Sequence, residues 1–324
     1  MITRRALIRL STASAFAAGV GGRAADAQTW PTRPIRFLVP FAAGGPTDAI
    51  ARIVGERLSK IWDQQVVIEN KGGAGGNLAF EAAARSEADG YTMVMGGSTL
   101  AANRSLYRTL SYDAVADFAP VSAICNFSYF MFVSNAVPAQ SVKEFIAYAK
   151  ENKDKLTMAS PGTGSAPHLC GEYFKRVAGI EMAHAPYRGA GPAMGDLMPG
   201  RVHLLFSGGA TLENARAGQV RVLGYTGSKR AAMAPDVPTI AEAGLPGFEV
   251  ASWYGLFVPA RTPDHTTRTM NATAVTALTD PSVVGRLDQL GYTAAASTRE
   301  ELAAHLKADI DKWSRVINEA GIAI

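Results

Sequence analysis

The stretch FLVPFAAGGPTD, Phe37 to Asp48, decides how this chain is expected to fold. Phe37–Val39 indicates a buried strand, and the small residues Ala42–Gly45 indicate a loop. Pro46 suits the first position of a helix, and Asp48 falls in its first turn. Glycines let a backbone approach a ligand closely, and free amides at a helix start attract anions. Taken alone, the stretch fits an ordinary strand-to-helix turn equally well.

Length, composition and charge set the class of protein. The chain has 324 residues and is 48% hydrophobic, which is enough for a large core and suggests two domains. It carries 32 basic and 28 acidic residues, and without residues 1–27 it carries 28 basic and 27 acidic ones. The basic character therefore comes mostly from the leader. We expect no basic surface for nucleic acid.

Residues 1–27 have the pattern of an export signal. Arg4 and Arg5 precede a soft apolar run, Ser14–Val20, and Ala25–Ala27 fits a small-x-small cleavage site. The start, TRRALIRL, is also typical of a twin-arginine signal, so Sec and twin-arginine export both stay open. No later segment has about 18 uninterrupted apolar residues, and we expect no transmembrane helix.

Strand–small loop–helix units recur along the chain. Gly96–Thr99 follows a predicted strand, and Ser160–Ser165, Arg188–Gly191 and Ser207–Gly209 each do so in a later block. Such alternation predicts doubly wound α/β domains with parallel sheets, and it places the loops at one edge of each sheet. Two such edges facing each other would form a cleft lined by amides and hydroxyls, which suits a small carboxylate. We expect 28–128 with 250–324 as domain 1 and 129–249 as domain 2, joined by a hinge.

The sequence gives little support for an enzyme, a metal site or a disulfide. The chain has no G-x-S-x-G elbow, no P-loop and no complete G-x-G-x-x-G, so we expect no catalytic residue and no cofactor. Ser165 and His168 could form a hydrolytic pair, but helix capping by Ser165 is the commoner role. No cysteine–histidine spacing indicates a metal. Cys125 and Cys170 both lie in apolar or helical contexts, which favours buried free thiols.

Several long motifs resemble the Bug-type, TctC-like receptors of tripartite tricarboxylate transporters. They include RPIRFLVPFAAGGPTDAIAR, QVVIENKGGAGGN, APYRGAGPAMGDLMPGRVHLLFSGG and PDVPTIAEAGLPGFEVASWYGLFVPA, and together the matching segments span nearly the whole mature chain in order. The resemblance implies the architecture of type II periplasmic binding proteins, whose two α/β domains close on a ligand. It also implies a receptor rather than an enzyme.

The resemblance further implies a monomer in the periplasm, with the leader cleaved near Ala27. Its partners would be a small carboxylate (a dicarboxylate, a tricarboxylate or an aromatic carboxylate) and a membrane permease. A ligand-presenting role toward a sensor kinase and a periplasmic hydrolase remain the alternatives. Relatives commonly have aspartate where this chain has Ser207. That difference puts a ligand with an amino group in doubt.

The candidate ligand-binding residues lie in five segments. The first segment would hold a carboxylate through the backbone of Ala43–Thr47, while Asp48 holds the amides of the loop in place. Arg188 could clamp a carboxylate or lie solvated. The full set is Phe41, Ala43, Gly44, Gly45, Pro46, Thr47 and Asp48; Ser98 and Thr99; Ser160, Gly162, Thr163, Gly164, Ser165 and His168; Tyr187, Arg188, Gly189 and Ala190; and Phe206, Ser207 and Gly208.

Overall fold

The buried strand and the helix expected around Phe37–Asp48 are both present in the computed structural model, which describes residues 30–320. The predicted export signal, residues 1–27, lies outside the described residues. Of the described residues, 33–320 belong to one compact unit and 30–32 to a separate one. In the described part of the chain, no helix is long and apolar enough to cross a membrane.

Lobe 1 is built on a six-stranded sheet. Its strands are β1 (Ile35–Val39), β2 (Val66–Asn70), β3 (Thr92–Gly97), β4 (Phe118–Ser128), β10 (Ala251–Pro259) and β11 (Thr293–Ala294). They lie in the order β11-β4-β10-β3-β1-β2. The strands β1, β2 and β3 are parallel, as predicted, whereas β10 runs antiparallel to both β3 and β4. The helices of this lobe are α2 (Pro46–Trp62), α3 (Asn77–Ala84), α4 (Ser98–Leu106), α9 (Asp264–Leu278), α10 (Pro281–Gln289) and α11 (Arg299–Ala320), with a 3-10 turn, η1 (Ala74–Gly76).

Lobe 2 is built on a five-stranded sheet. Its strands are β5 (Phe130–Ser134), β6 (Thr157–Ser160), β7 (Ala183–Pro186), β8 (Leu204–Ser207) and β9 (Val220–Tyr225), in the order β7-β6-β8-β5-β9. The strands β6, β7 and β8 are parallel, and β5 runs antiparallel to its two neighbours. Its helices are α5 (Val142–Glu151), α6 (Ala166–Ala178), α7 (Ala190–Leu197) and α8 (Leu212–Arg216), with a 3-10 turn, η2 (Gly209–Thr211).

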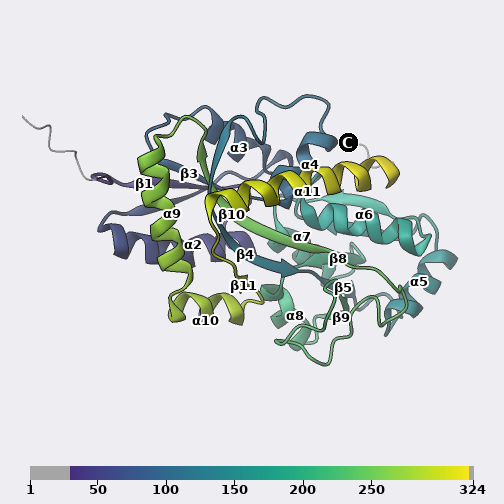
Figure 1. Cartoon of the computed structure of the whole chain (residues 1–324). Coiled ribbons are helices and arrows are strands. Elements are labelled where there is room, and N and C mark those ends of the chain that lie inside the picture. Colours follow the sequence, from purple (N-terminus) through teal and green to yellow (C-terminus); the bar gives the residue numbers. More distant parts are fainter. Residues whose placement is uncertain (1–29, 321–324) are drawn as a thin grey trace, which may run out of the picture. The chain divides into compact units, whose positions relative to one another are not determined.

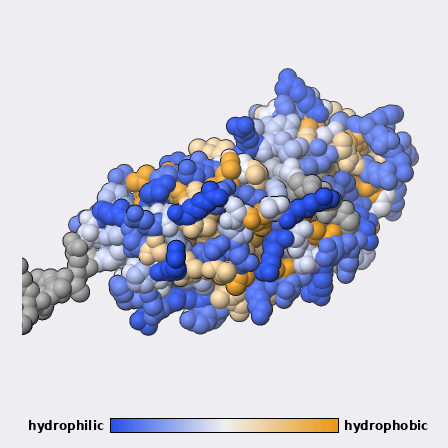
Figure 2. All heavy atoms as spheres, turned by 90° about the horizontal axis from the view of Figure 1, so that it is seen from above, coloured by the Kyte–Doolittle hydropathy of each residue, from blue (hydrophilic) through white to orange (hydrophobic). Residues whose placement is uncertain are grey.

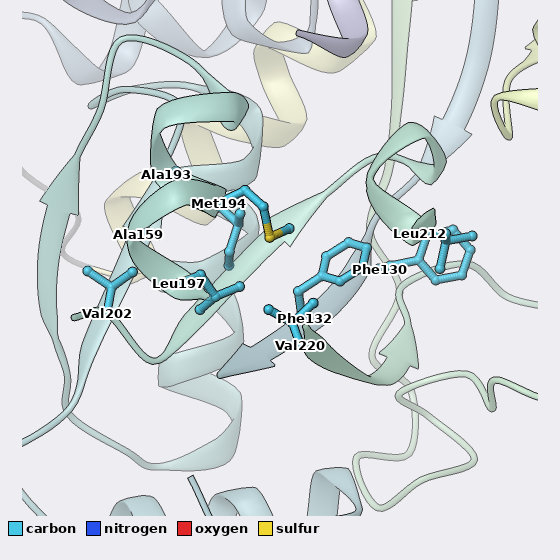
Figure 3. Packing of buried hydrophobic residues seen from close by; sticks show 10 residues of the cluster. Phe130, Phe132, Ala159, Ala193, Met194, Leu197, Val202, Leu212 and Val220 are labelled. Atoms are coloured by element: carbon cyan, nitrogen blue, oxygen red, sulfur yellow. The ribbon is translucent and has the colours of Figure 1, made fainter. Parts of the chain in front are cut away.

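One core cluster of lobe 2 lies between its sheet and α7. Phe130 and Phe132 of β5 pack in one cluster with Met194 and Leu197 of α7, as Figure 3 shows. All four side chains are at most 4% exposed. Burying large apolar side chains is the main stabilising contribution to a fold, so this cluster holds the β8–β5–β9 region together with α7.

The last helix, α11, connects the two lobes. Its start is a capping box: Glu301 N donates to Thr298 Oγ1 at 3.1 Å, and Thr298 N donates to Glu301 Oε2 at 2.8 Å. In Figure 1, α11 is the yellow helix that runs past α4 to α6, and it contacts both. The apolar stripe of this helix is buried and packs into the core; it consists of Leu302, Leu306, Ile310, Trp313 and Ile317.

The chain passes between the lobes at segments that are tied to one another. Thr226 N donates to Tyr129 O at 2.8 Å, and Tyr129 N donates to Thr226 Oγ1 at 2.8 Å. The same hydroxyl donates to Val250 O at 2.7 Å, and Val250 N donates to Thr226 O at 2.9 Å. These bonds connect the β4–β5 junction with both ends of the stretch between β9 and β10.

The surface fits a protein exposed to water. On the face shown in Figure 2, hydrophilic residues predominate, and apolar residues lie singly or in small groups. Among the described residues, the exposed large hydrophobic side chains are Leu78, Val115 and Val177. Scattered apolar residues of this kind are normal for a water-soluble surface.

Candidate functional site

A cavity lies where the two lobes meet, and we call it the cleft cavity. Its volume is about 40 Å³, more than the roughly 10–15 Å³ that a single water requires. None of its lining residues is charged. They are Phe41, Ala42, Gly45, Pro46, Thr47, Ser98, Thr99, Phe127, Tyr129, Ser252, Tyr254 and Tyr292 from lobe 1 and its crossing segment, and Pro161, Ala166, Pro167, Gly189, Ala190, Ser207 and Gly208 from lobe 2.

Four helices begin at this cavity, and their first residues line it. They are α2 and α4 of lobe 1, and α6 and α7 of lobe 2. The first amides of a helix have no partner within the helix, and its N-terminus carries a partial positive charge of roughly half an elementary charge. The two walls of the cavity therefore favour an anion without any basic side chain.

The start of α6 is already satisfied by other groups. Ala166 N donates to Thr99 Oγ1 at 3.2 Å, and His168 N donates to Ser165 Oγ at 3.4 Å. Ser165 is therefore the N-cap of α6, as the sequence suggested. The bond from Ala166 to Thr99 also joins the two lobes beside the cavity. The helix starts that remain available to a ligand are those of α2, α4 and α7.

Asp48 supports the first loop from beneath. Its Oδ2 accepts from Gly44 N at 2.9 Å and from Arg52 Nε at 2.9 Å. Burial alone would raise the pKa of Asp48, but hydrogen bonds from Arg52 and Gly44 outweigh it and hold that pKa below its usual range. Gly44 has φ +79, a backbone conformation that favours glycine. Of the amides that Asp48 was predicted to hold, the structure pairs that of Gly44 with its carboxylate.

A cluster of aromatic rings forms one side of the cavity. Phe127 of β4 stacks on Tyr254 of β10 with ring centroids 4.9 Å apart. The rings of Tyr292 and Tyr129 meet Phe127 edge to face, at 5.0 Å and 5.3 Å. The Tyr254 hydroxyl lies 2.9 Å from Thr47 Oγ1. Burial raises the pKa of Tyr254, so its hydroxyl stays neutral.

Ser98 brings an unsatisfied hydroxyl to the cavity. It is the first residue of α4 and is only 1% exposed. Its Oγ has no hydrogen-bond partner among the described residues. A buried hydroxyl without a partner is costly, so such a group is a candidate for binding a polar ligand atom.

Two stacked histidines lie behind the loop between β6 and α6. The rings of His168 and His184 are 3.9 Å apart, and His184 Nε2 lies 2.7 Å from Ser160 Oγ. His168 Nδ1 accepts from Gly164 N at 3.2 Å. Burial lowers the pKa of His168 to about 3 and that of His184 to about 4, so both are neutral near pH 7. They hold the loop that carries Gly162 and Thr163.

A second cavity of about 420 Å³ lies beside the first, and we call it the glycine-rich cavity. It is lined by Gly72–Gly76 of lobe 1 and by Gly162, Thr163, Tyr187 and Arg188 of lobe 2. Arg188 is exposed and has no ion pair in the described part of the chain. The Tyr187 hydroxyl donates to Asp196 Oδ2 at 2.7 Å instead of entering the cleft cavity.

The structure therefore divides the predicted site residues into three groups. The cleft cavity is lined by Phe41, Gly45, Pro46, Thr47, Ser98, Thr99, Gly189, Ala190, Ser207 and Gly208. Gly162, Thr163, Tyr187 and Arg188 line the glycine-rich cavity, which Phe41 also reaches. Neither cavity is lined by Ala43, Gly44, Asp48, Ser160, Gly164, Ser165, His168 or Phe206.

Several lining residues were missed by sequence reasoning. The candidate set omitted Phe127, Tyr129, Ser252, Tyr254 and Tyr292. Ser252 and Tyr254 are two apart in a strand and so share one face. That alternation was the available signal. Asn77 is the first residue of α3 and accepts at Oδ1 from Asn103 Nδ2 and the Tyr112 hydroxyl, while Gly76 takes the cap position.

The described residues contain no candidate metal centre. No group of three or more His, Cys, Asp or Glu residues among them could hold a metal ion. Cys125 and Cys170 are buried and free. The cleft cavity combines free helix starts, an unsatisfied hydroxyl and aromatic rings, an arrangement suited to binding a small anion.

Comparisons with known proteins agree with this interpretation. A family described as "Tripartite tricarboxylate transporter family receptor" matches residues 50–322. A "UPF0065 protein in tcbD-tcbE intergenic region" of Pseudomonas sp. (strain P51) is 38% identical over 299 residues, covering 92% of this chain and 89% of the relative.

The structure of the periplasmic binding protein BugD is 33% identical with a TM-score of 0.88, covering 91% of this chain and 100% of that one. The structure of R. palustris Rpa4515 with adipate is 36% identical with a TM-score of 0.88 and the same coverage. The predicted two-domain α/β architecture of periplasmic binding proteins is confirmed.

Proposed function

Because the chain belongs to the TctC family of tripartite tricarboxylate transporter receptors, whose members are solute-binding receptors and not enzymes, we propose that it captures a small carboxylate in the cleft cavity. Rpa4515, a similar protein, has adipate in its structure, which supports this class of ligand. The observation that carries the proposal is the meeting of helix starts from both lobes at one uncharged cavity. Backbone amides there replace the water around a carboxylate.

We also propose how the receptor works as part of a transporter. The domains comprise 28–128 with 250–324, and 129–249. These bounds are supported by the course of the chain, which passes from the sheet of lobe 1 to the sheet of lobe 2 between β4 and β5 and returns between β9 and β10. A ligand that contacts both walls stabilises the closed arrangement, which a membrane permease then recognises. The chain acts as a monomer in the periplasm, after removal of its leader near Ala27. The alternative to delivery to a permease is that the receptor presents its bound ligand to a sensor kinase.

A ligand screen tests the proposal. The mature protein is heated with succinate, adipate, citrate or benzoate, and with the uncharged amide of each acid as a control. A ligand that binds only the native state at 100 times its Kd stabilises it by about 2.7 kcal/mol, which raises the melting temperature. At least one acid should do so while its amide does not. If no carboxylate shifts the melting temperature, or if the bound acid is recovered chemically altered, the proposed function is wrong.

A further inference from the structure

We propose that the carboxylate bound in the cleft cavity carries an aromatic ring as its body. The inference rests on the proposed function, because it specifies the ligand class of the same site. Its basis is the aromatic floor of the cavity, which we define as Phe127, Tyr129, Tyr254 and Tyr292. A fifth ring, Phe41, lines the cavity from the loop after β1.

The aromatic floor is a built feature of the crossing region. Phe127 is its centre, because it stacks on Tyr254 and meets Tyr129 and Tyr292 edge to face. All four floor residues are buried or half-buried, and Phe127 is 6% exposed. Thr47 of α2 fixes the hydroxyl end of Tyr254. The rings therefore have fixed positions, and they offer a ligand ring the offset and edge-to-face contacts that aromatic groups prefer.

The charge around the cavity limits the number of carboxylate groups that one ligand can carry. Since α6 is already capped, the starts of α2, α4 and α7 remain, and at roughly half a charge each they offset one to two negative charges. The unpartnered Oγ of Ser98 lies at the same wall and can donate to a carboxylate oxygen. No charged side chain lines the cavity. A tricarboxylate would have to bury charge without a cation, which is costly.

The shared lining of the cleft cavity links the two ends of the ligand. The helix starts and the aromatic floor line the same cavity, so a small acid that is held at the helix starts also contacts the floor. A flat ring gains both apolar burial and specific ring contacts there. A saturated ring or chain of similar size gains only the burial. The structure therefore favours aromatic over aliphatic acids.

Matched pairs of acids test the inference by isothermal titration calorimetry. Benzoate, phenylacetate and terephthalate are each compared with cyclohexanecarboxylate, cyclohexylacetate and cyclohexane-1,4-dicarboxylate, and adipate is added as an aliphatic reference. Native mass spectrometry first verifies that the purified protein retains no small molecule. The tightest aromatic acid should bind at least about tenfold more tightly than its saturated partner and than adipate.

The outcomes separate this inference from the proposed function. A preference below tenfold, or a saturated acid or adipate that binds as tightly, overturns the aromatic assignment and leaves a carboxylate receptor. If none of the acids binds, nor succinate or citrate, the proposed function itself fails. Phe127→Leu should reduce the aromatic preference toward onefold. Phe132→Leu, which removes a buried ring of the lobe 2 core that does not line the cleft cavity, should leave the preference intact. An unchanged preference in Phe127→Leu contradicts the role of the aromatic floor.

Discussion

At the scale of single residues, Ser98 combines two properties that rarely occur together. It lies at the start of a helix that lines the cavity, and its hydroxyl is buried without a partner. In a protein that only needs to fold, such a group costs stability; in a receptor, the cost is offset when a ligand accepts its hydrogen bond. The same reasoning explains why the lining has no basic residue. Neutral donors bind the anion without leaving a bare charge when it departs.

Replacing this serine should therefore act in opposite directions on folding and on binding. Ser98→Ala should leave the free energy of unfolding of the ligand-free protein unchanged or raise it by up to about 1 kcal/mol, because an unsatisfied polar group is removed. Affinity for the carboxylate should fall about tenfold, because one donor to a charged group is lost. Chemical denaturation and calorimetry measure the two effects.

Ser59→Ala is the matched control. Ser59 Oγ donates to Gly55 O at 2.7 Å and accepts from Val66 N at 2.9 Å, far from the cavity lining. This variant should lose stability and keep its affinity. If Ser98→Ala behaves in the same way as Ser59→Ala, then the hydroxyl of Ser98 does not meet the ligand.

At the scale of elements, local patterns predicted the walls of the cavity but not its aromatic floor. Strand–loop–helix units are recognisable because apolar runs, glycines and prolines lie close together in sequence. The loops that lead into α2, α4 and α7 were therefore predicted, although α4 and α7 begin within the stretches expected to be loop. The aromatic floor depends on the pairing of β4 with β10, where Ser252 lies opposite Phe127. That register joins residues more than a hundred positions apart, and no local pattern encodes it.

The loop between β6 and α6 depends on two histidines that must remain neutral. Their pKa values in the folded protein, about 3 for His168 and about 4 for His184, lie below the ordinary value of 6.5. The unfolded chain therefore binds more protons between these values. Their contribution to stability is complete above about pH 6.5 and is lost as the pH falls toward 4 and 3. Glu172, 3.7 Å from His168 Nε2, and Lys175 are the charged groups nearby.

We expect the melting temperature to fall between pH 7.5 and pH 5, and less so in His168→Asn. Asparagine keeps an acceptor for Gly164 N but cannot take up a proton. His265, exposed on α9, provides the control, and His265→Asn should show the pH dependence of the unaltered protein. Thermal unfolding at several pH values measures this. A His168→Asn variant with the full pH dependence would show that the stacked pair is not responsible.

At the scale of the whole molecule, few direct bonds between the described residues hold the lobes together around the cleft cavity. The Tyr107 hydroxyl, just after α4, donates to Thr163 O of lobe 2 at 3.1 Å, and Ala166 N donates to Thr99 Oγ1. Gly208 also packs so closely against the Tyr292 hydroxyl that a Cβ there would collide with it. A small number of contacts of this kind suits a receptor, because a ligand can shift the balance between open and closed forms only by its differential affinity.

Removing one of these bonds should make the ligand-free protein more open. For Tyr107→Phe we expect a larger radius of gyration in X-ray solution scattering without ligand, and the value of the unaltered protein with saturating carboxylate. A neutral hydrogen bond contributes about 0.5–1.5 kcal/mol, so affinity should fall roughly two- to tenfold as the closed form becomes less populated. Tyr112→Phe is the control, because the Tyr112 hydroxyl donates to Asn77 Oδ1 within lobe 1. It should lower stability without changing either quantity, whereas equal affinities in the two variants would mean that Tyr107 does not govern closure.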